Sequence, residues 1–358
     1  MRKEEISEIL KELLEKKYKK YYGKPKEVDR YISSKEELEK DDLVLLIQSL
    51  LGDEDIFAWL EFISSKLDII AEDSSDFISM LESIIIKVKN DLAQGSFIRA
   101  LINLGEKKPD LGFNLYKRII SSSKNPNIIP YAGLILGGVG RVDPENIIKY
   151  IEDVLLDDKI EEPIKAAVTK AIRVIIEKKE QLDYEEQFFE ILNNVSNVKN
   201  GRLLKIEAIN LNFELFKFNK DTCFENLVNL TTKNSTDSLK YMVADRLWIW
   251  GLDDTEKEFH LINILSDSND KAILNRISYY LAKNYNKDNN ATFEIISNFL
   301  RKDKGRELDY MFNEMNDNDF NFYYDKIKLL LNKETDLKVL YSLFHLINYI
   351  SEINEEKK

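Results

Sequence analysis

Cysteine and histidine are scarce in this chain of 358 residues, which has one cysteine, Cys223, and two histidines, His260 and His345. A single cysteine excludes an internal disulfide framework and a cysteine-built metal site. Neither histidine has a cysteine or an acidic cluster beside it at ligand spacing, so we expect packing or surface histidines, no metal and no cofactor. Cys223 is predicted to be a small core residue; the alternative is a thiol whose pKa is lowered near a helix start.

Long apolar runs are also missing. The longest stretch without a charged residue, from Asn125 to Gly140, contains two prolines and four glycines, and a membrane span needs about 20 apolar residues. Residues 1–22 are too charged for a signal peptide. They predict instead an amphipathic helix that caps the fold, with a basic and aromatic run, 16–24, that could contact an anion or a membrane surface. We therefore expect a cytoplasmic protein with no membrane span.

Strand patterns are absent from the sequence, and helix-forming residues are abundant. Prolines number six and glycines twelve, and no sustained alternation of apolar and polar residues occurs, which predicts an all-α fold. From residue 94 onward, helix pairs begin near residues 95, 126, 161, 199, 235, 269, 304 and 334. A period of this length is typical of helical-hairpin solenoids, in which each hairpin covers the apolar face of its neighbour. We predict an acidic, less regular helical portion over 1–93 and a continuous array over 94–358.

Seven of the twelve glycines and three of the six prolines fall between Gln94 and Arg141. We expect Gly105 to end one first helix and the 137–140 run, Gly-Gly-Val-Gly, to end the next. Pro109 and Pro144 are predicted to open second helices, the latter behind Asp143 as N-cap. A phosphate-binding loop is the alternative for the glycine run, but the strand and the lysine that such loops require are missing.

Residues Leu136–Arg141, followed by Pro144 and the Ile147-Ile148 pair, resemble the inter-helix signature of HEAT-like repeats of the armadillo type. Residues Leu104–Pro109 resemble a looser copy. The resemblance covers about 50 residues of the chain and implies a right-handed α-α superhelix, a solenoid that serves as a scaffold for protein binding. It also implies that second helices line the concave face.

Charge is unevenly distributed. The chain carries a formal net charge of -12, yet residues 94–141 hold seven Lys and Arg against two Asp and Glu. We predict that basic and amide side chains of this region contact a protein or peptide partner, and their charge favours an acidic one. These candidates are Arg99, Asn103, Lys107, Lys108, Asn114, Lys117, Arg118, Arg141 and Lys149. The alternative for them is a solvated surface.

A second function from another class is suggested by residues 245–250, Asp-Arg-Leu-Trp-Ile-Trp. An Asp beside two tryptophans resembles HEAT-like DNA alkylation-repair glycosylases. However, Trp248 and Trp250 lie about 200 degrees apart around a helix and cannot line one face, and the net negative charge opposes binding to a polyanion. The predicted function is therefore a non-enzymatic scaffold for a protein or peptide, with nucleic-acid binding as the alternative.

Overall fold

The structure is a computed structural model, and it describes residues 64, 67, 71, 77–82, 91–123, 125–126, 128–177, 179–197, 199–232, 235–315 and 317–356. Every regular element in these residues is a helix, as the composition predicts. The chain divides into two compact units, residues 1–191 and 192–358, and each is described by itself. Most of the portion predicted over residues 1–93, including the helix predicted over 1–22, lies outside the described residues.

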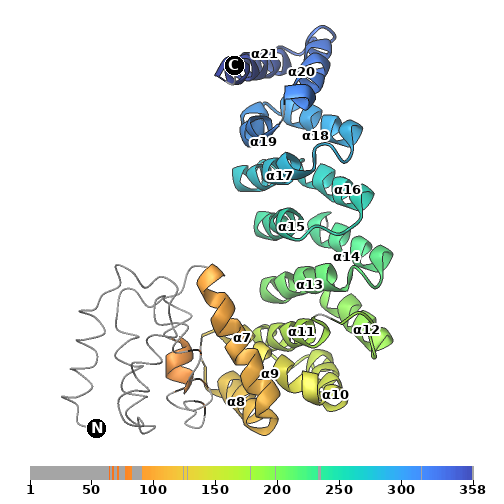
Figure 1. The fold of residues 1–358 in the computed structure, drawn as a ribbon. Helices are drawn as coiled ribbons and strands as arrows, with labels where there is room; N and C mark the ends of the chain where they lie inside the picture. Colours follow the sequence, from red (N-terminus) through yellow and green to blue (C-terminus); the bar gives the residue numbers. More distant parts are fainter. Residues whose placement is uncertain are drawn as a thin grey trace, which may run out of the picture. The chain divides into compact units, whose positions relative to one another are not determined.

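In the first unit, three first helices lie side by side and two second helices pack against them (Figure 1). The first helices are α7 (Asp91–Lys107), α9 (Ile129–Val142) and α11 (Glu162–Ile176). The second helices are α8 (Pro109–Ser122) and α10 (Pro144–Leu156). A further helix, α12 (Glu185–Val195), contains the point at which the two units divide.

Prolines open the second helices of this unit, as predicted. Pro109 and Pro144 are the first residues of α8 and α10, where the missing backbone N–H has no partner to lose. Asp143 holds the N-cap position of α10, but its carboxylate accepts hydrogen bonds from the Asn146 amide at 2.9 and 3.1 Å and none from the backbone. The proline therefore starts the helix without a side-chain cap.

The glycines do not end the helices, and this prediction was wrong. α7 continues through Gly105 to Lys107, and α9 continues through Gly137, Gly138 and Gly140 to Val142. Among the glycines of the described residues, only Gly251 has a positive φ, so none of those in α7 or α9 adopts the left-handed helix-ending conformation.

Close packing between first helices explains the glycines instead. A Cβ at Gly138 would lie 2.1 Å from the carbonyl oxygen of Ile102 on α7, and a Cβ at Gly133 would lie 2.0 Å from that of Ala167 on α11. α9 thus approaches both neighbours with bare backbone. The absence of side chains at these points lets three helices pack almost backbone to backbone.

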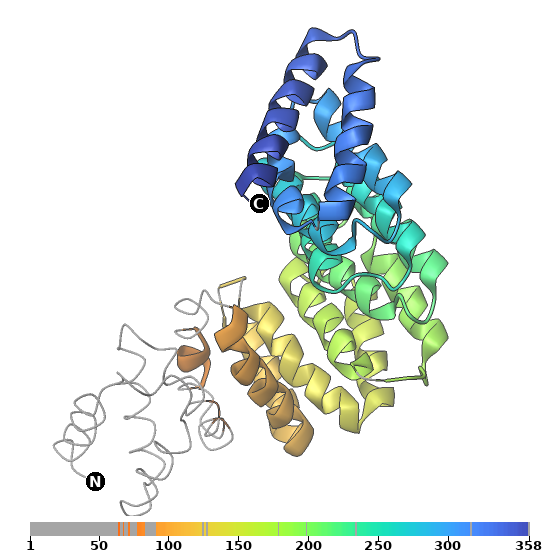
Figure 2. The ribbon, with the colours of Figure 1, turned by 45° about the horizontal axis from the view of Figure 1, so that its top comes forward.

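The second unit contains two layers of helices and a final hairpin (Figure 1). One layer consists of α13 (Arg202–Leu215), α15 (Asp237–Ile249), α17 (Lys271–Asn284), the 3-10 helix η1 (Gly305–Leu308) and α19 (Asp309–Glu314). The other layer consists of α14 (Lys220–Thr232), α16 (Thr255–Leu265) and α18 (Asn289–Arg301). The final hairpin, clearest in Figure 2, pairs α20 (Asp317–Leu331) with α21 (Leu337–Glu356).

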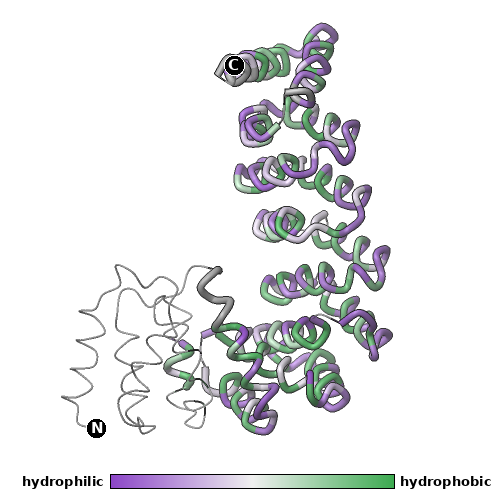
Figure 3. The backbone as a smooth tube through the Cα atoms, viewed as in Figure 1, coloured by the Kyte–Doolittle hydropathy of each residue, from purple (hydrophilic) through white to green (hydrophobic). Residues whose placement is uncertain are grey.

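The first helices begin within a few residues of the predicted positions, so the period is confirmed as helical hairpins. The last of them, α21, packs on α20 and opens no further pair in the described residues. Apolar residues gather where the layers meet, and the outer turns of α14 and α16 are hydrophilic (Figure 3). Asp254, Asp270 and Asp288 cap α16, α17 and α18, and each carboxylate accepts a backbone N–H. Both units are therefore stacks of helical hairpins, which is the all-α solenoid architecture that the repeat predicts.

Candidate functional site

The nine side chains predicted as a partner contact lie in both layers of the first unit. Arg99, Asn103 and Lys107 belong to α7, Lys108 to the following turn, Asn114, Lys117 and Arg118 to α8, Arg141 to α9 and Lys149 to α10. All are exposed except Lys108 and Arg141, which are partly buried. The Lys117 ammonium lies 4.2 Å from the centre of the Phe113 ring, and both residues are on α8. The group is therefore split between first and second helices.

Arg141 has a structural role within the hairpin stack. Its Nε donates a hydrogen bond to the carbonyl oxygen of Val174 at 2.9 Å, and its guanidinium pairs with Glu177 and, at 3.6 Å, with Glu106. One side chain of α9 thus joins α7 to the end of α11. The acidic residues lie one repeat before and one repeat after Arg141, and this spacing is the sequence signal for the network.

An aromatic ladder runs along the first layer of the second unit, and sequence reasoning missed it. It consists of Trp248 on α15, Tyr279 on α17 and Tyr310 on α19, at intervals of 31 residues. The Trp248 and Tyr279 rings are 5.5 Å apart between centroids, and the Tyr279 and Tyr310 rings are 4.5 Å apart in an edge-to-face arrangement. Aromatic pairs at these separations attract each other beyond the effect of burial. The repeat period is the signal that could have revealed the ladder.

An ion pair between two helices holds the ladder in place. Arg276 Nε lies 3.0 Å from a carboxylate oxygen of Asp245, one repeat earlier, and the guanidinium donates to the Tyr241 hydroxyl at 2.7 and 3.0 Å. The guanidinium carbon lies 4.6 Å from the centre of the Trp248 ring. Because the guanidinium both pairs with a carboxylate and stacks on a ring, it fixes the position of Trp248.

A second aromatic group lies at the end of α15. Trp250 packs against Phe213 with ring centroids 6.1 Å apart, and the Arg246 guanidinium lies 4.5 Å from the Trp250 ring. Arg246 Nε donates to Asn210 Oδ1 at 2.8 Å. Gly251 follows with a φ of 66°, which turns the chain toward α16. Trp250 and Ile249 are exposed at 45% and 50%.

The glycosylase resemblance implies that an Asp and aromatic side chains face a DNA lesion, and the arrangement at Asp245 differs from this. The carboxylate pairs with Arg276 at 3.0 Å and with Arg246 at 3.4 Å, and the side chain is only 15% exposed. Trp248 and Trp250 contact different partners, as their spacing predicts. These residues therefore form a cross-linked aromatic surface in which the carboxylate is engaged by two cations.

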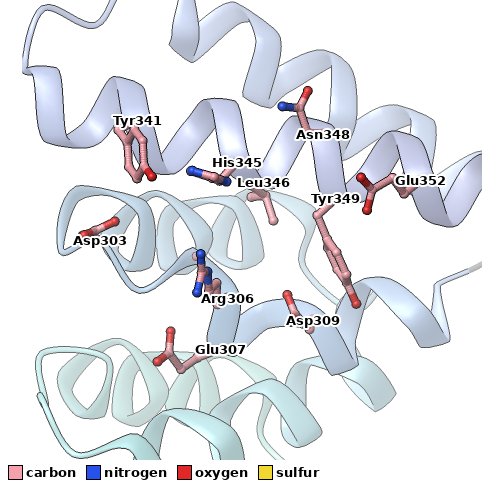
Figure 4. A pocket seen from close by; sticks show the side chains of 11 residues that line it. Asp303, Arg306, Glu307, Asp309, Tyr341, His345, Leu346, Asn348, Tyr349 and Glu352 are labelled. Carbon is pink, nitrogen blue, oxygen red and sulfur yellow. The ribbon is translucent and has the colours of Figure 1, made fainter.

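A cavity of about 690 Å³, here called the C-terminal groove, lies between α21 and the η1–α19 segment (Figure 4). Tyr341, His345 and Tyr349 line it from α21. The Tyr341 and His345 rings are 4.3 Å apart, and the Tyr349 hydroxyl accepts a hydrogen bond from Asn313 on α19 at 3.1 Å. Aromatic side chains thus form one wall of the groove.

Charged side chains line the opposite wall and one end. Asp303, Glu307 and Asp309 extend from the chain around η1, together with Arg306, and Glu352 extends from α21 (Figure 4). Burial and the nearby Glu307 charge raise the pKa of the Asp309 carboxyl above its ordinary value, and the charges of Arg306 and Lys271 offset part of this rise. Four carboxylates face one guanidinium, so the groove has a net negative charge when these acids are ionised.

Cys223 and His260 both pack against neighbouring side chains or the core. Cys223 is buried, as predicted, and burial raises the pKa of its thiol to about 12, which is opposite to the alternative of an activated thiol. His260 is exposed and packs edge-to-face on Phe224. Within the described residues, no group of three or more potential ligand side chains could hold a metal ion, and no helix could cross a membrane.

Comparison with known proteins finds similarity to solved structures. Neither a protein-family model nor a curated protein sequence matches the chain. A solved structure described as the Kap95:Nup1 complex aligns with 93% of this chain at 10% sequence identity and a TM-score of 0.35. The alignment covers 52% of that chain, so this chain spans about half its length. The hairpin architecture described above rests on the packing of the helices themselves.

Proposed function

We propose that this chain is a non-enzymatic scaffold that binds a protein or peptide partner on the first-layer surface of its second unit. The observation that carries the proposal is the aromatic ladder of Trp248, Tyr279 and Tyr310 with Arg276 stacked on it. Tryptophan, tyrosine and arginine dominate the binding energy of protein interfaces. Tyr310 is 46% exposed and offers the free end of the ladder to a partner.

Pre-organisation supports the same conclusion. The Asp245–Arg276 pair and the Tyr241 hydroxyl hold the guanidinium before any partner arrives. A surface that is already ordered loses less side-chain entropy on binding, so more of the contact energy contributes to affinity. Rigid aromatic side chains also have few rotatable bonds for their contact area.

The exposed basic and amide side chains of the first unit are proposed as a second contact, which would favour an acidic partner. Asn103 and Lys107 on α7 and Asn114 and Lys117 on α8 are exposed. Charges at the rim of an interface mainly raise the association rate and its dependence on salt. This contact would therefore affect how fast a partner binds more than how tightly it is held.

Affinity capture from a native lysate, with mass spectrometry, tests the proposal. The bait is the whole chain, compared with the ladder variant Tyr279→Ala/Tyr310→Ala and the basic-group variant Lys107→Glu/Lys117→Glu/Lys149→Glu. Arg141 is left intact because it joins helices. Glu294→Gln, an exposed carboxylate on α18, is the matched control. Circular dichroism shows whether each variant is folded.

We expect wild type and the control to capture the same protein in stoichiometric amount. The folded ladder variant should not capture it. If the captured protein is lost only with the basic-group variant, the partner contact lies on the first unit and not on the ladder. Co-purification of nucleic acid alone, released by moderate salt, would contradict the proposal and support the nucleic-acid alternative.

A further inference from the structure

We infer that the C-terminal groove binds an arginine side chain of the protein partner. The inference rests on the proposed function, because it assigns to the same partner a contact beyond the aromatic ladder. It is carried by the charge, shape and position of the groove.

The groove is rich in carboxylates. Asp303, Glu307, Asp309 and Glu352 line the groove against the single guanidinium of Arg306. These carboxylates come from the loop before η1, from η1, from α19 and from α21, and they are spread along the groove (Figure 4). A guanidinium presents five N–H donors in a planar fork, so it can reach separated carboxylates that a compact ammonium cannot reach together.

One wall of the groove is aromatic. Tyr341 is 62% exposed, and with His345 and Tyr349 it covers the side of the groove formed by α21. A guanidinium stacks on aromatic faces as well as pairing with carboxylates. The arrangement repeats what the chain does with its own Arg276, which pairs with Asp245 and stacks on Trp248.

Asp309 in the groove is partly desolvated. This carboxyl is partly buried beside Glu307, and both effects raise its pKa, whereas the charges of Arg306 and Lys271 lower it by less. A cation placed in the groove would offset the Glu307 charge and favour the ionised carboxylate. Because the net shift of the Asp309 pKa is upward, an incoming guanidinium would favour the ionised carboxylate further.

Position connects the groove to the ladder. Glu307 follows Arg276 by 31 residues, as Arg276 follows Asp245, and Asp309 precedes Tyr310 of the ladder. A partner that lies along Trp248, Tyr279 and Tyr310 would therefore reach the groove at its next contact. The aromatic ladder and the C-terminal groove together would recognise a partner segment in which an apolar or aromatic stretch is followed by an arginine.

Peptide selection tests the inference without a known partner. Random peptides displayed on phage are selected on the whole chain, and the tightest binder is synthesised with a fluorophore and measured by anisotropy. The probes are this peptide and its Arg→Lys and Arg→citrulline analogues. The protein variants are Glu307→Gln/Glu352→Gln in the groove, Tyr279→Ala/Tyr310→Ala in the ladder and Glu294→Gln as the control.

We expect selected peptides to contain arginine and citrulline to weaken wild-type binding about tenfold or more, the effect of losing charge-assisted hydrogen bonds. The groove variant should weaken binding of the arginine peptide and no longer distinguish it from citrulline. Spermidine, added as a competitor, should displace the peptide only weakly, because it cannot form the guanidinium fork.

Other outcomes overturn the inference in distinguishable ways. Selection of peptides without basic residues would contradict the groove assignment. Arginine peptides that bind the groove variant as tightly as wild type would contradict it too. In either case the proposed function stands if the ladder variant no longer binds the selected peptides. If spermidine displaces the labelled peptide at concentrations as low as those at which the peptide binds, the groove recognises free amines, and the arginine assignment is contradicted. If no peptide binds, the inference fails together with the peptide-binding form of the proposed function.

Discussion

Asp245 on α15 and Arg276 on α17 occupy the same position in successive repeats, and 3.0 Å separates the carboxylate oxygen from the guanidinium Nε. Both side chains are mostly buried, at 15% and 24% exposed. The pair ties two first helices together and places the guanidinium on Trp248. A contact made to stabilise the repeat therefore also shapes the proposed binding surface.

Replacing Arg276 with methionine should destabilise the second unit. The change removes the pair with Asp245 and the hydrogen bonds to Tyr241, and it leaves a mostly buried carboxylate with Arg246 alone. We expect the free energy of unfolding, measured in urea, to fall by about 2 kcal/mol. Arg301→Met, at an exposed position on α18, should cost less than about 0.5 kcal/mol. Equal losses in the two variants would show that the pair contributes nothing specific.

Adding a methyl group at Gly138 should be costly. Its Cβ would lie 2.1 Å from the Ile102 carbonyl oxygen, a backbone atom that moves only if α7 moves. We expect Gly138→Ala to lower the free energy of unfolding by about 3 kcal/mol, although alanine is the better helix former. Val142→Ala, at a side chain 53% exposed on the same helix, is the control. A Gly138→Ala variant as stable as wild type would refute the backbone-to-backbone packing.

The Tyr323 hydroxyl should contribute a stability that disappears at alkaline pH. Its oxygen lies 3.0 Å from both the Tyr285 carbonyl oxygen and Asn289 Oδ1, which are the two acceptors for its single proton, and burial raises its pKa to about 12. At neutral pH, Tyr323→Phe should therefore cost about 1.5 kcal/mol.

The sign of the pH dependence follows from the raised pKa. Below about pH 10 the hydroxyl is protonated in both folded and unfolded chains, and its contribution is complete. As the pH rises from about 10 toward 12, the unfolded chain ionises first and the contribution is lost. Wild type should thus lose about 1.4 kcal/mol relative to Tyr323→Phe by about pH 11. If the difference in unfolding free energy between wild type and Tyr323→Phe stays constant from pH 8 to about 11, the raised pKa of Tyr323 is contradicted.

Cys223 should be inert toward thiol reagents in the folded protein. Its side chain is fully buried, and burial raises the pKa of the thiol to about 12. We expect Ellman's reagent at about pH 8 to react with one thiol in urea and only through rare unfolding in buffer. Fast stoichiometric reaction of the native protein would show that the thiol is accessible, and Cys223→Ala identifies any background reaction.

Much of the architecture could be predicted because it follows from local chemistry. The positions of Pro109 and Pro144 and the hairpin period are set by short stretches of sequence. The glycines misled the prediction because a glycine serves equally to end a helix and to allow a close neighbour, and only the packed helices distinguish these uses.

The candidate site was harder to predict because its members come from different repeats. Trp248 and Tyr310 are 62 residues apart in sequence, and each taken alone is an ordinary aromatic residue on a helix. Their relation depends on α15, α17 and α19 lying side by side. Arg141 was also hard to interpret from the sequence. Its charge suggests a partner contact, but in the fold it pairs with Glu106 and Glu177, which lie one repeat before and one repeat after it.

Hydrogen–deuterium exchange of the whole chain, free and bound to the captured partner, tests the central claim most directly. Binding through the aromatic ladder predicts slower exchange in the segments that carry it, 241–250, 272–283 and 305–313, and little change in α14 and α16 of the opposite layer. Protection confined to the first unit, or protection of α14 and α16 in place of the ladder segments, would contradict the proposed binding surface.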